Sequence, residues 1–199
     1  MSPRPDVSAQ RKPQILDAAY AVFLAKGVAG ATIADIAREA GVSTALIFLY
    51  FQSKDELLLA FFQRYFGAVH ERLAELEQSK LPVTAALMAW CDGLAAELGT
   101  EGGQALGQEL LALASRDVAI RAVVAEAYEA YRAALSRMLG RGMMRGEIGA
   151  GNADAIAVSL IAMIEGLNVL QLASGSGDLA GAYRRGIGQI LPGFTRQGA

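Results

Sequence analysis

The chain has 199 residues, of which 53% are hydrophobic and 19% are charged. Eighteen lysines and arginines against 20 acidic residues give a formal net charge of −2, so a nucleic-acid function must rest on a local patch of charge. One cysteine, Cys91, and one histidine, His70, exclude an internal disulfide and the usual zinc sites. The single cysteine and the polar N-terminus without an apolar signal segment lead us to expect an unprocessed cytoplasmic protein.

The charged residues are not spread evenly along the chain. Residues 1–54 carry six lysines and arginines against four acidic residues, whereas residues 55–199 carry 12 against 16. This asymmetry favours a polyanionic partner for the front of the chain, with an acidic and apolar body behind it.

The first predicted element is a helix whose apolar face runs from Ile15 to Phe23 at spacings of three and four residues. Pro13 suits the first turn of this helix, because the missing N–H has no partner there. Gly27 suits a left-handed cap, so we expect the helix to end at that residue.

Two short helices joined by a glycine turn are predicted next. Thr32 is a suitable N-terminal cap with Asp35 three residues later, and an Ala-Gly-Val segment predicts the turn. Ser43 caps the third helix, whose Ile47 and the following Phe51 are expected in the core. Short helices in this arrangement predict a helix-turn-helix.

A long fourth helix is predicted from Ser53 to about Gln78, opened by a Ser-x-x-Glu capping box with Glu56. It is long enough to link two modules. Further helical patterns follow near residues 83–99, 103–115, 117–145, 152–173 and 177–191. The sequence has no strand alternation of useful length, so the predicted fold class is all-α.

The stretch from Gly27 to Lys54 reads GVAGATIADIAREAGVSTALIFLYFQSK. Its order of glycine, helix caps, turn and aromatic end resembles the DNA-binding domain of TetR-type (TetR/AcrR) transcriptional repressors. The resemblance implies a three-helix DNA-binding domain at residues 1–54 and a helical effector-binding and dimerisation domain at residues 55–199. It also implies a ligand-responsive repressor, not an enzyme, which a small-molecule effector releases from double-stranded operator DNA.

The resemblance assigns residues to the DNA contact. Thr32, Tyr50 and Lys54 are the implied phosphate contacts, and a helix N-terminus, a hydroxyl and an ammonium group suit that role. For Thr32 and Ser43 a purely structural use as helix caps stays open. The residues expected on or beside the recognition helix, or in a basic N-terminal arm, are Ser43, Thr44, Ala45, Phe48, Leu49, Arg4, Arg11 and Lys12.

Few side chains of the recognition helix can form a hydrogen bond with a base edge, in contrast to the pattern of the family. Ala45, Phe48 and Leu49 instead favour apolar contact with thymine methyl groups and readout of DNA shape. We therefore expect A·T-leaning operators or modest sequence specificity.

The segment from Ala153 to Ala173 is apolar and almost long enough to span a membrane. Asp154, Glu165 and Asn168 interrupt it and make insertion costly, so a buried or interface helix is favoured and no membrane partner is expected. The resemblance implies that the last two helices pair with their copies in a homodimer. A dimer would also place two recognition helices on two DNA half-sites.

A pocket for the effector is implied by the resemblance. The residues considered as its lining or its polar contacts are His70, Trp90, Leu94, Glu109, Leu110, Tyr128, Tyr131, Met163, Glu165 and Asn168. For each of them a place in the core is the competing interpretation. An apolar lining would favour lipophilic ligands, whereas inward-facing Glu109 and Glu165 would favour cations. No cofactor and no metal is predicted.

Two other classes of function have less support. An enzyme that uses His70 as a base lacks an accompanying Gly-x-Ser-x-Gly or paired-carboxylate motif. A helical dimeric ligand-binding or scaffold protein without specific DNA binding is the more serious alternative, because the recognition helix is so apolar.

Overall fold

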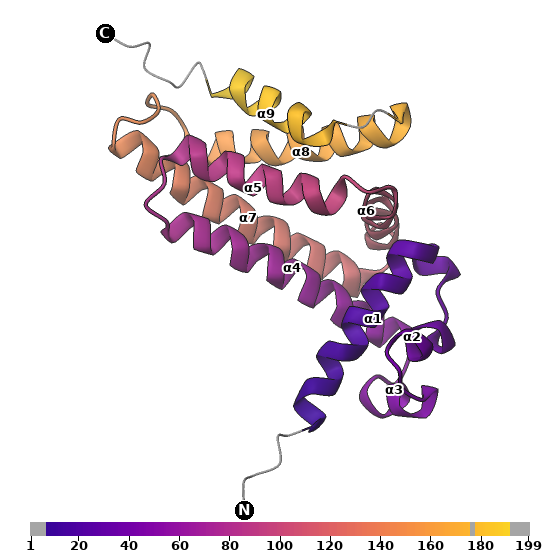
Figure 1. Cartoon of the computed structure of the whole chain (residues 1–199). Coiled ribbons are helices and arrows are strands. Elements are labelled where there is room, and N and C mark those ends of the chain that lie inside the picture. The colour runs from indigo at the N-terminus through magenta and orange to yellow at the C-terminus, as the bar shows by residue number, and fades with distance from the viewer. Residues whose placement is uncertain (1–6, 176–177, 192–199) are drawn as a thin grey trace, which may run out of the picture. The chain divides into compact units, whose positions relative to one another are not determined.

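The structure is a computed structural model that describes residues 7–175 and 178–191. Within those ranges every regular element is a helix (Figure 1), which confirms the all-α prediction. The helices are α1 (Val7–Gly30), α2 (Ile33–Glu39), α3 (Thr44–Tyr50), α4 (Lys54–Gln78), α5 (Val83–Leu98), α6 (Glu101–Ala114), α7 (Val118–Met144), α8 (Ala153–Ser174) and α9 (Leu179–Ile190).

The helices form two compact units. The first takes in Met1–Tyr65 and Ala105–Val123, and the second takes in Phe66–Gln104 and Val124–Ala199. The boundaries fall inside α4, α6 and α7, so these three helices continue from one unit into the other. The functional boundary at residue 54, between a DNA-binding domain and an effector-binding domain, stays a prediction.

The first unit is built on an aromatic core shared by α1 and the start of α4. Phe23 meets Phe61 edge to face with ring centroids 5.1 Å apart, and Tyr20 stacks on Phe61 at 5.9 Å. Ile15 and Phe23 are almost fully buried, as the predicted apolar face of the first helix requires. This core supports the two short helices, because α2 packs against α1 and α3 packs against α2.

Both ends of the first helix differ from the prediction. The helix begins at Val7, so Pro13 lies inside it and not in its first turn. At this position proline cannot donate a hydrogen bond to the carbonyl four residues earlier, and its ring crowds that carbonyl. Gly27 does break the helix, but with φ 68° and ψ 167° it is not in the left-handed helical region, and one more turn follows to Gly30.

The predicted capping box of the fourth helix is only half present. The Ser53 hydroxyl accepts a hydrogen bond from the Glu56 N–H at 3.1 Å. The Glu56 carboxylate accepts from the N–H of Gln52 at 2.6 Å, one residue before the expected partner. The chain between α3 and α4 turns sharply enough to bring that earlier N–H within reach.

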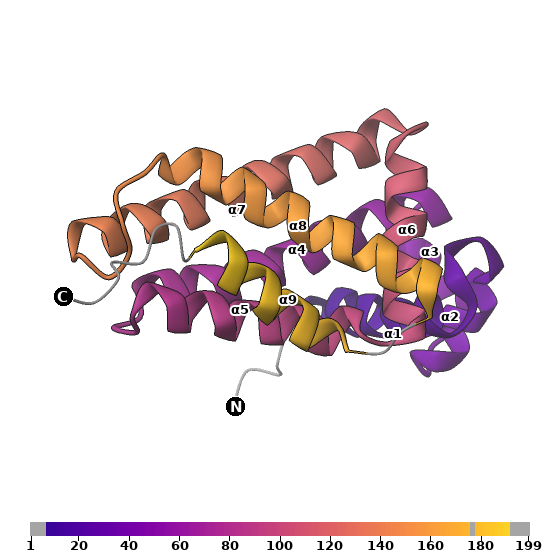
Figure 2. The ribbon, with the colours of Figure 1, turned by 90° about the horizontal axis from the view of Figure 1, so that it is seen from above.

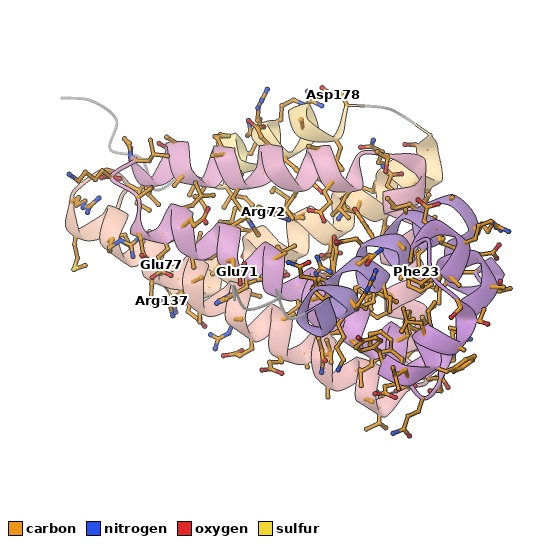
Figure 3. The ribbon with its side chains drawn as sticks, turned by 60° about the horizontal axis from the view of Figure 1, so that its bottom comes forward. Phe23, Glu71, Arg72, Glu77, Arg137 and Asp178 are labelled. Carbon is orange, nitrogen blue, oxygen red and sulfur yellow. The ribbon has the colours of Figure 1, made fainter. Side chains whose placement is uncertain are left out.

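The second unit is a bundle in which α9 lies along α8 and α5 (Figures 1 and 2). Glu77, near the end of α4, accepts two hydrogen bonds from the Arg137 guanidinium of α7 at 2.7 and 2.9 Å (Figure 3). Arg141 also donates to the backbone carbonyl of Glu77. The Arg137 bonds, and a weaker one from Arg141 to the carboxylate at 3.3 Å, hold the pKa of Glu77 below its usual value. A cation at the carboxyl end of α4 is also favourable for the helix dipole.

Helix α8 is the most apolar long helix of the described chain, and by length and composition it could cross a membrane. Asn152 caps its start by accepting from the N–H groups of Asp154 and Ala155, both at 3.1 Å. Asn168 and Gln171 are buried polar residues of α8, whereas Val158 and other apolar side chains of the helix are exposed. This helix therefore has apolar side chains on both sides: a buried side that also holds these two polar residues, and an exposed apolar side.

Candidate nucleic-acid interface

The start of α2 has the cap that the sequence predicts. The Thr32 hydroxyl accepts from the N–H of Asp35 at 3.1 Å, and the Asp35 carboxylate accepts from the N–H and the hydroxyl of Thr32 at 3.2 and 2.8 Å. Asp35 also accepts from Lys26 at 2.7 Å and from Arg38. These bonds, that from Lys26 first, hold the pKa of Asp35 far below its usual value.

The turn between α2 and α3 also follows the prediction. Gly41 has φ +65°, a conformation that favours glycine, and the Val42 N–H donates to the Ala37 carbonyl at 2.9 Å. The Ser43 hydroxyl then caps α3 by accepting from the N–H of Leu46 at 3.1 Å. The second and third helices therefore form a helix-turn-helix.

The two sides of α3 differ sharply in exposure. Ile47 and the following Phe51 are buried, as predicted. On the other side, Phe48 is 51% and Leu49 is 76% exposed, although apolar side chains are usually placed inside a protein. The other exposed residues predicted for this surface are Ser43, Thr44 and Ala45, and Tyr50 is half-buried.

Two of the three predicted arm residues, Arg11 and Lys12, lie inside α1 and not in an extended arm, and both have neighbours in the helix-turn-helix region. The Lys12 ammonium lies 5.7 Å from the centroid of the Phe51 ring. Arg11 donates to the side chain of Gln14 at 2.8 Å, and Gln14 donates to the Ala40 carbonyl at 2.8 Å. Sequence reasoning missed Gln14, because only the packing of α1 against α2 brings it to the turn. Arg4 lies outside the described residues.

Lys54 has a structural use that the sequence does not reveal. Its ammonium donates to the carbonyls of Val28 and Ala31, both at 2.7 Å. An ammonium group has three donors, so one remains for a phosphate. The phosphate contacts of Lys54, Thr32 and Tyr50 stay predictions.

Glu109 and Leu110, considered for the effector pocket, belong to the first unit. The Glu109 carboxylate accepts from the N–H of Val28, just after the break in α1. Leu110 is buried. Glu109 is therefore occupied as a cap for the last turn of α1, a role that local sequence gives no sign of.

The other pocket candidates lie in the second unit. Glu165 accepts hydrogen bonds from Tyr128 and Asn168, and Asn168 accepts from the hydroxyl of Tyr183. Burial raises the pKa of the Glu165 carboxyl, and the two hydrogen bonds oppose the shift. Sequence reasoning missed Tyr183, which joins α9 to this group.

Three of the pocket candidates each have a buried polar atom that makes no hydrogen bond within the described part of the chain. These atoms are Nδ1 of His70, Nε1 of Trp90 and the hydroxyl of Tyr131. Trp90 and Leu94 also line an open pocket of about 220 Å³ between α4 and α5. Met163 packs beside Gly186, where an added Cβ would lie 2.2 Å from its sulfur.

Comparisons with known proteins agree with this geometry. Residues 15–61 match the model of the bacterial regulatory proteins of the tetR family, and residues 82–187 match a tetracyclin repressor-like C-terminal domain. The HTH-type transcriptional regulator CymR of Pseudomonas putida is 30% identical over 177 residues, which cover 86% of each chain. The fatty acid metabolism regulator protein of Bacillus subtilis is 28% identical over 145 residues, 71% of this chain and 74% of that protein.

The fold is shared with solved structures. A TetR transcription regulator from Haloarcula marismortui superposes with a TM-score of 0.82 at 21% identity, covering 94% of this chain and 98% of that one. The matched regions take in both the helix-turn-helix and most of the second unit. The chain therefore belongs to the tetR family of bacterial regulatory proteins, and it is a ligand-responsive, DNA-binding transcriptional regulator.

Proposed function

We propose that this regulator is a cytoplasmic repressor whose dimer places two copies of α3 in the major grooves of one operator. The observation that carries the proposal is the outer face of α3, where Phe48 and Leu49 are exposed. In a helix-turn-helix this second helix enters the major groove. Thymine methyl groups would cover the apolar side chains, so we expect an A·T-leaning operator.

The homodimer is proposed to form through α8 and α9. Val158, Ala162, Val169 and Leu172 are exposed on α8, and their spacings of four, seven and three residues place them on one side of the helix. An apolar strip of this kind marks a partner surface. A second copy of α8 would bury it.

Repression is proposed to end when a small molecule binds in the second unit. The dimer is proposed to have two arrangements, of high and low affinity for DNA, and the ligand must bind the low-affinity arrangement more tightly. By linkage, the factor by which the ligand weakens operator binding equals the factor by which operator DNA weakens ligand binding. Helices α4, α6 and α7 belong to both units, so each offers a continuous path for the change. We assign the chain no catalytic role.

The experiment is a fluorescence titration of labelled DNA from the region upstream of the gene. We expect steep salt dependence, and Lys12→Ala should lower the slope of log K against log salt by about one. Lys80→Ala, which removes an exposed lysine of the second unit, should leave the slope unchanged. DNA binding that is absent, or indifferent to salt, would favour a ligand-binding dimer without DNA function.

A second pair of variants tests the apolar face. Leu49→Ser should weaken operator binding by about 1 kcal/mol, roughly fivefold. Val118→Ser is the matched control, because Val118 is 74% exposed, close to the 76% of Leu49, and lies on α7. Equal effects of the two variants would show that α3 does not read the DNA.

A further inference from the structure

Among the residues that the structure describes, one carboxylate of the second unit, Glu165 of α8, has no cationic partner. It accepts hydrogen bonds from two neutral groups, Tyr128 of α7 and Asn168 of α8. In the part of the second unit that the structure describes, each arginine forms an ion pair with another carboxylate, as Arg72 does with Glu97 at 2.5 Å. Neutral hydrogen bonds only partly offset the loss of hydration of a charge.

Aromatic rings lie beside this carboxylate. Tyr128 and Tyr131 meet edge to face with centroids 6.2 Å apart, and Phe66 lies 6.2 Å from Tyr131. Burial and then the charge of Glu165 raise the pKa of Tyr128. Burial, then Glu97 and last Glu165 raise the pKa of Tyr131, while Arg72 lowers it. The faces of aromatic rings attract cations.

Tyr131 provides an independent sign of a ligand. Its side chain is only 7% exposed, and its hydroxyl makes no hydrogen bond with the described residues. Buried hydroxyl groups normally have a partner, and leaving one without a partner is costly. The ring of Tyr131 meets that of Tyr128, which donates to Glu165, so the hydroxyl belongs to the same side-chain cluster as the carboxylate.

From this cluster we propose that the effector is an organic ammonium cation, held by Glu165 and by the rings of Tyr128 and Tyr131. The inference rests on the proposed function and names the chemical class of its effector. A cation compensates the unpaired carboxylate and contacts the ring faces. An anionic ligand would be repelled by Glu165, and a neutral ligand would leave the carboxylate uncompensated.

Three small molecules of similar shape but different charge test whether the site prefers a cation. Benzyltrimethylammonium is the cation, neopentylbenzene is its neutral isostere, and phenylmethanesulfonate is the anion. The chain contains one tryptophan, Trp90 in the second unit, so its fluorescence, checked by calorimetry, can report binding. We expect the cation to bind the unmodified protein about tenfold or more tightly than the neutral isostere.

Glu165→Gln then removes the charge while keeping a hydrogen-bonding side chain. It should reduce the affinity for the cation about tenfold and change that for the neutral probe by less than about twofold. Glu71→Gln, at an exposed acidic residue of α4, should change neither. If the Glu165 variant does not fold, the comparison of the three probes on the unmodified protein still decides.

The proposal is overturned if the neutral or anionic probe binds as tightly as the cation, if none of the three binds, or if Glu165→Gln leaves cation binding unchanged. Operator binding is measured in parallel on the unmodified protein. If the cation does not bind but the protein still binds operator DNA, only the proposed effector class is refuted. If the protein does not bind DNA, the proposed function is refuted.

Discussion

Replacing Gly27 by alanine perturbs the contact between α6 and the end of α1. Gly27 has φ 68° and ψ 167°, a region that is essentially restricted to glycine. A Cβ added there would lie 2.8 Å from Oε1 of Glu109, so the carboxylate would have to move. Moving it would break its hydrogen bond with the N–H of Val28.

The cost of Gly27→Ala has three parts. Backbone strain at such a position costs about 1–3 kcal/mol, and the lost hydrogen bond to a charged group costs about 1.5–3 kcal/mol. Alanine also lowers the conformational entropy of the unfolded chain, which stabilises the folded state by about 0.4–1 kcal/mol. We therefore expect the free energy of unfolding to fall by about 2–5 kcal/mol.

Urea unfolding of the full chain at a fixed protein concentration, followed by circular dichroism, measures this change. Gly30→Ala is the matched control, because Gly30 lacks the positive φ and its added Cβ would be 3.7 Å from the Lys26 Cβ. This control should leave the stability unchanged or raise it by up to about 1 kcal/mol.

The background variant Glu109→Ala separates the two contributions. Without the carboxylate no hydrogen bond remains to be lost, so Gly27→Ala should then cost the strain less the entropy contribution, about 0–2.5 kcal/mol. The reasoning is refuted if Gly27→Ala is as stable as the unmodified chain, or if Gly30→Ala is equally destabilising.

Two further predictions concern acid stability and dimer formation. Because hydrogen bonds make the folded Asp35 carboxyl the stronger acid, the unfolded chain takes up the proton first, and stability falls as the pH drops below about 4. Asp35→Asn should remove this part of the acid sensitivity in urea titrations between about pH 3 and 7, and an unchanged pH profile would contradict the assignment. Val169→Glu should convert the dimer to monomers in sedimentation equilibrium, whereas Met144→Glu, at an 82% exposed residue of α7, should not; a dimeric Val169→Glu variant would place the interface elsewhere.

Much of the fold and of the α2–turn–α3 region could be predicted, because it depends on contacts between residues close in sequence. The Thr32 cap with Asp35, the positive φ of Gly41 and the Ser43 cap are all interactions within three or four residues. The buried Ile47 beside the exposed Phe48 likewise follows from helical spacing. Such features can be predicted without knowing the path of the rest of the chain.

Tertiary structure alone decided which distant groups complete these local elements. Glu109 caps the turn at Val28 from 81 residues away, and Lys54 binds the carbonyls of the same turn from α4. The convergence of Glu165, Asn168 and Tyr183 likewise needs α8 and α9 side by side. These pairs cannot be predicted from their spacing in the sequence. They form because the packing of the helices brings the two residues close together in space.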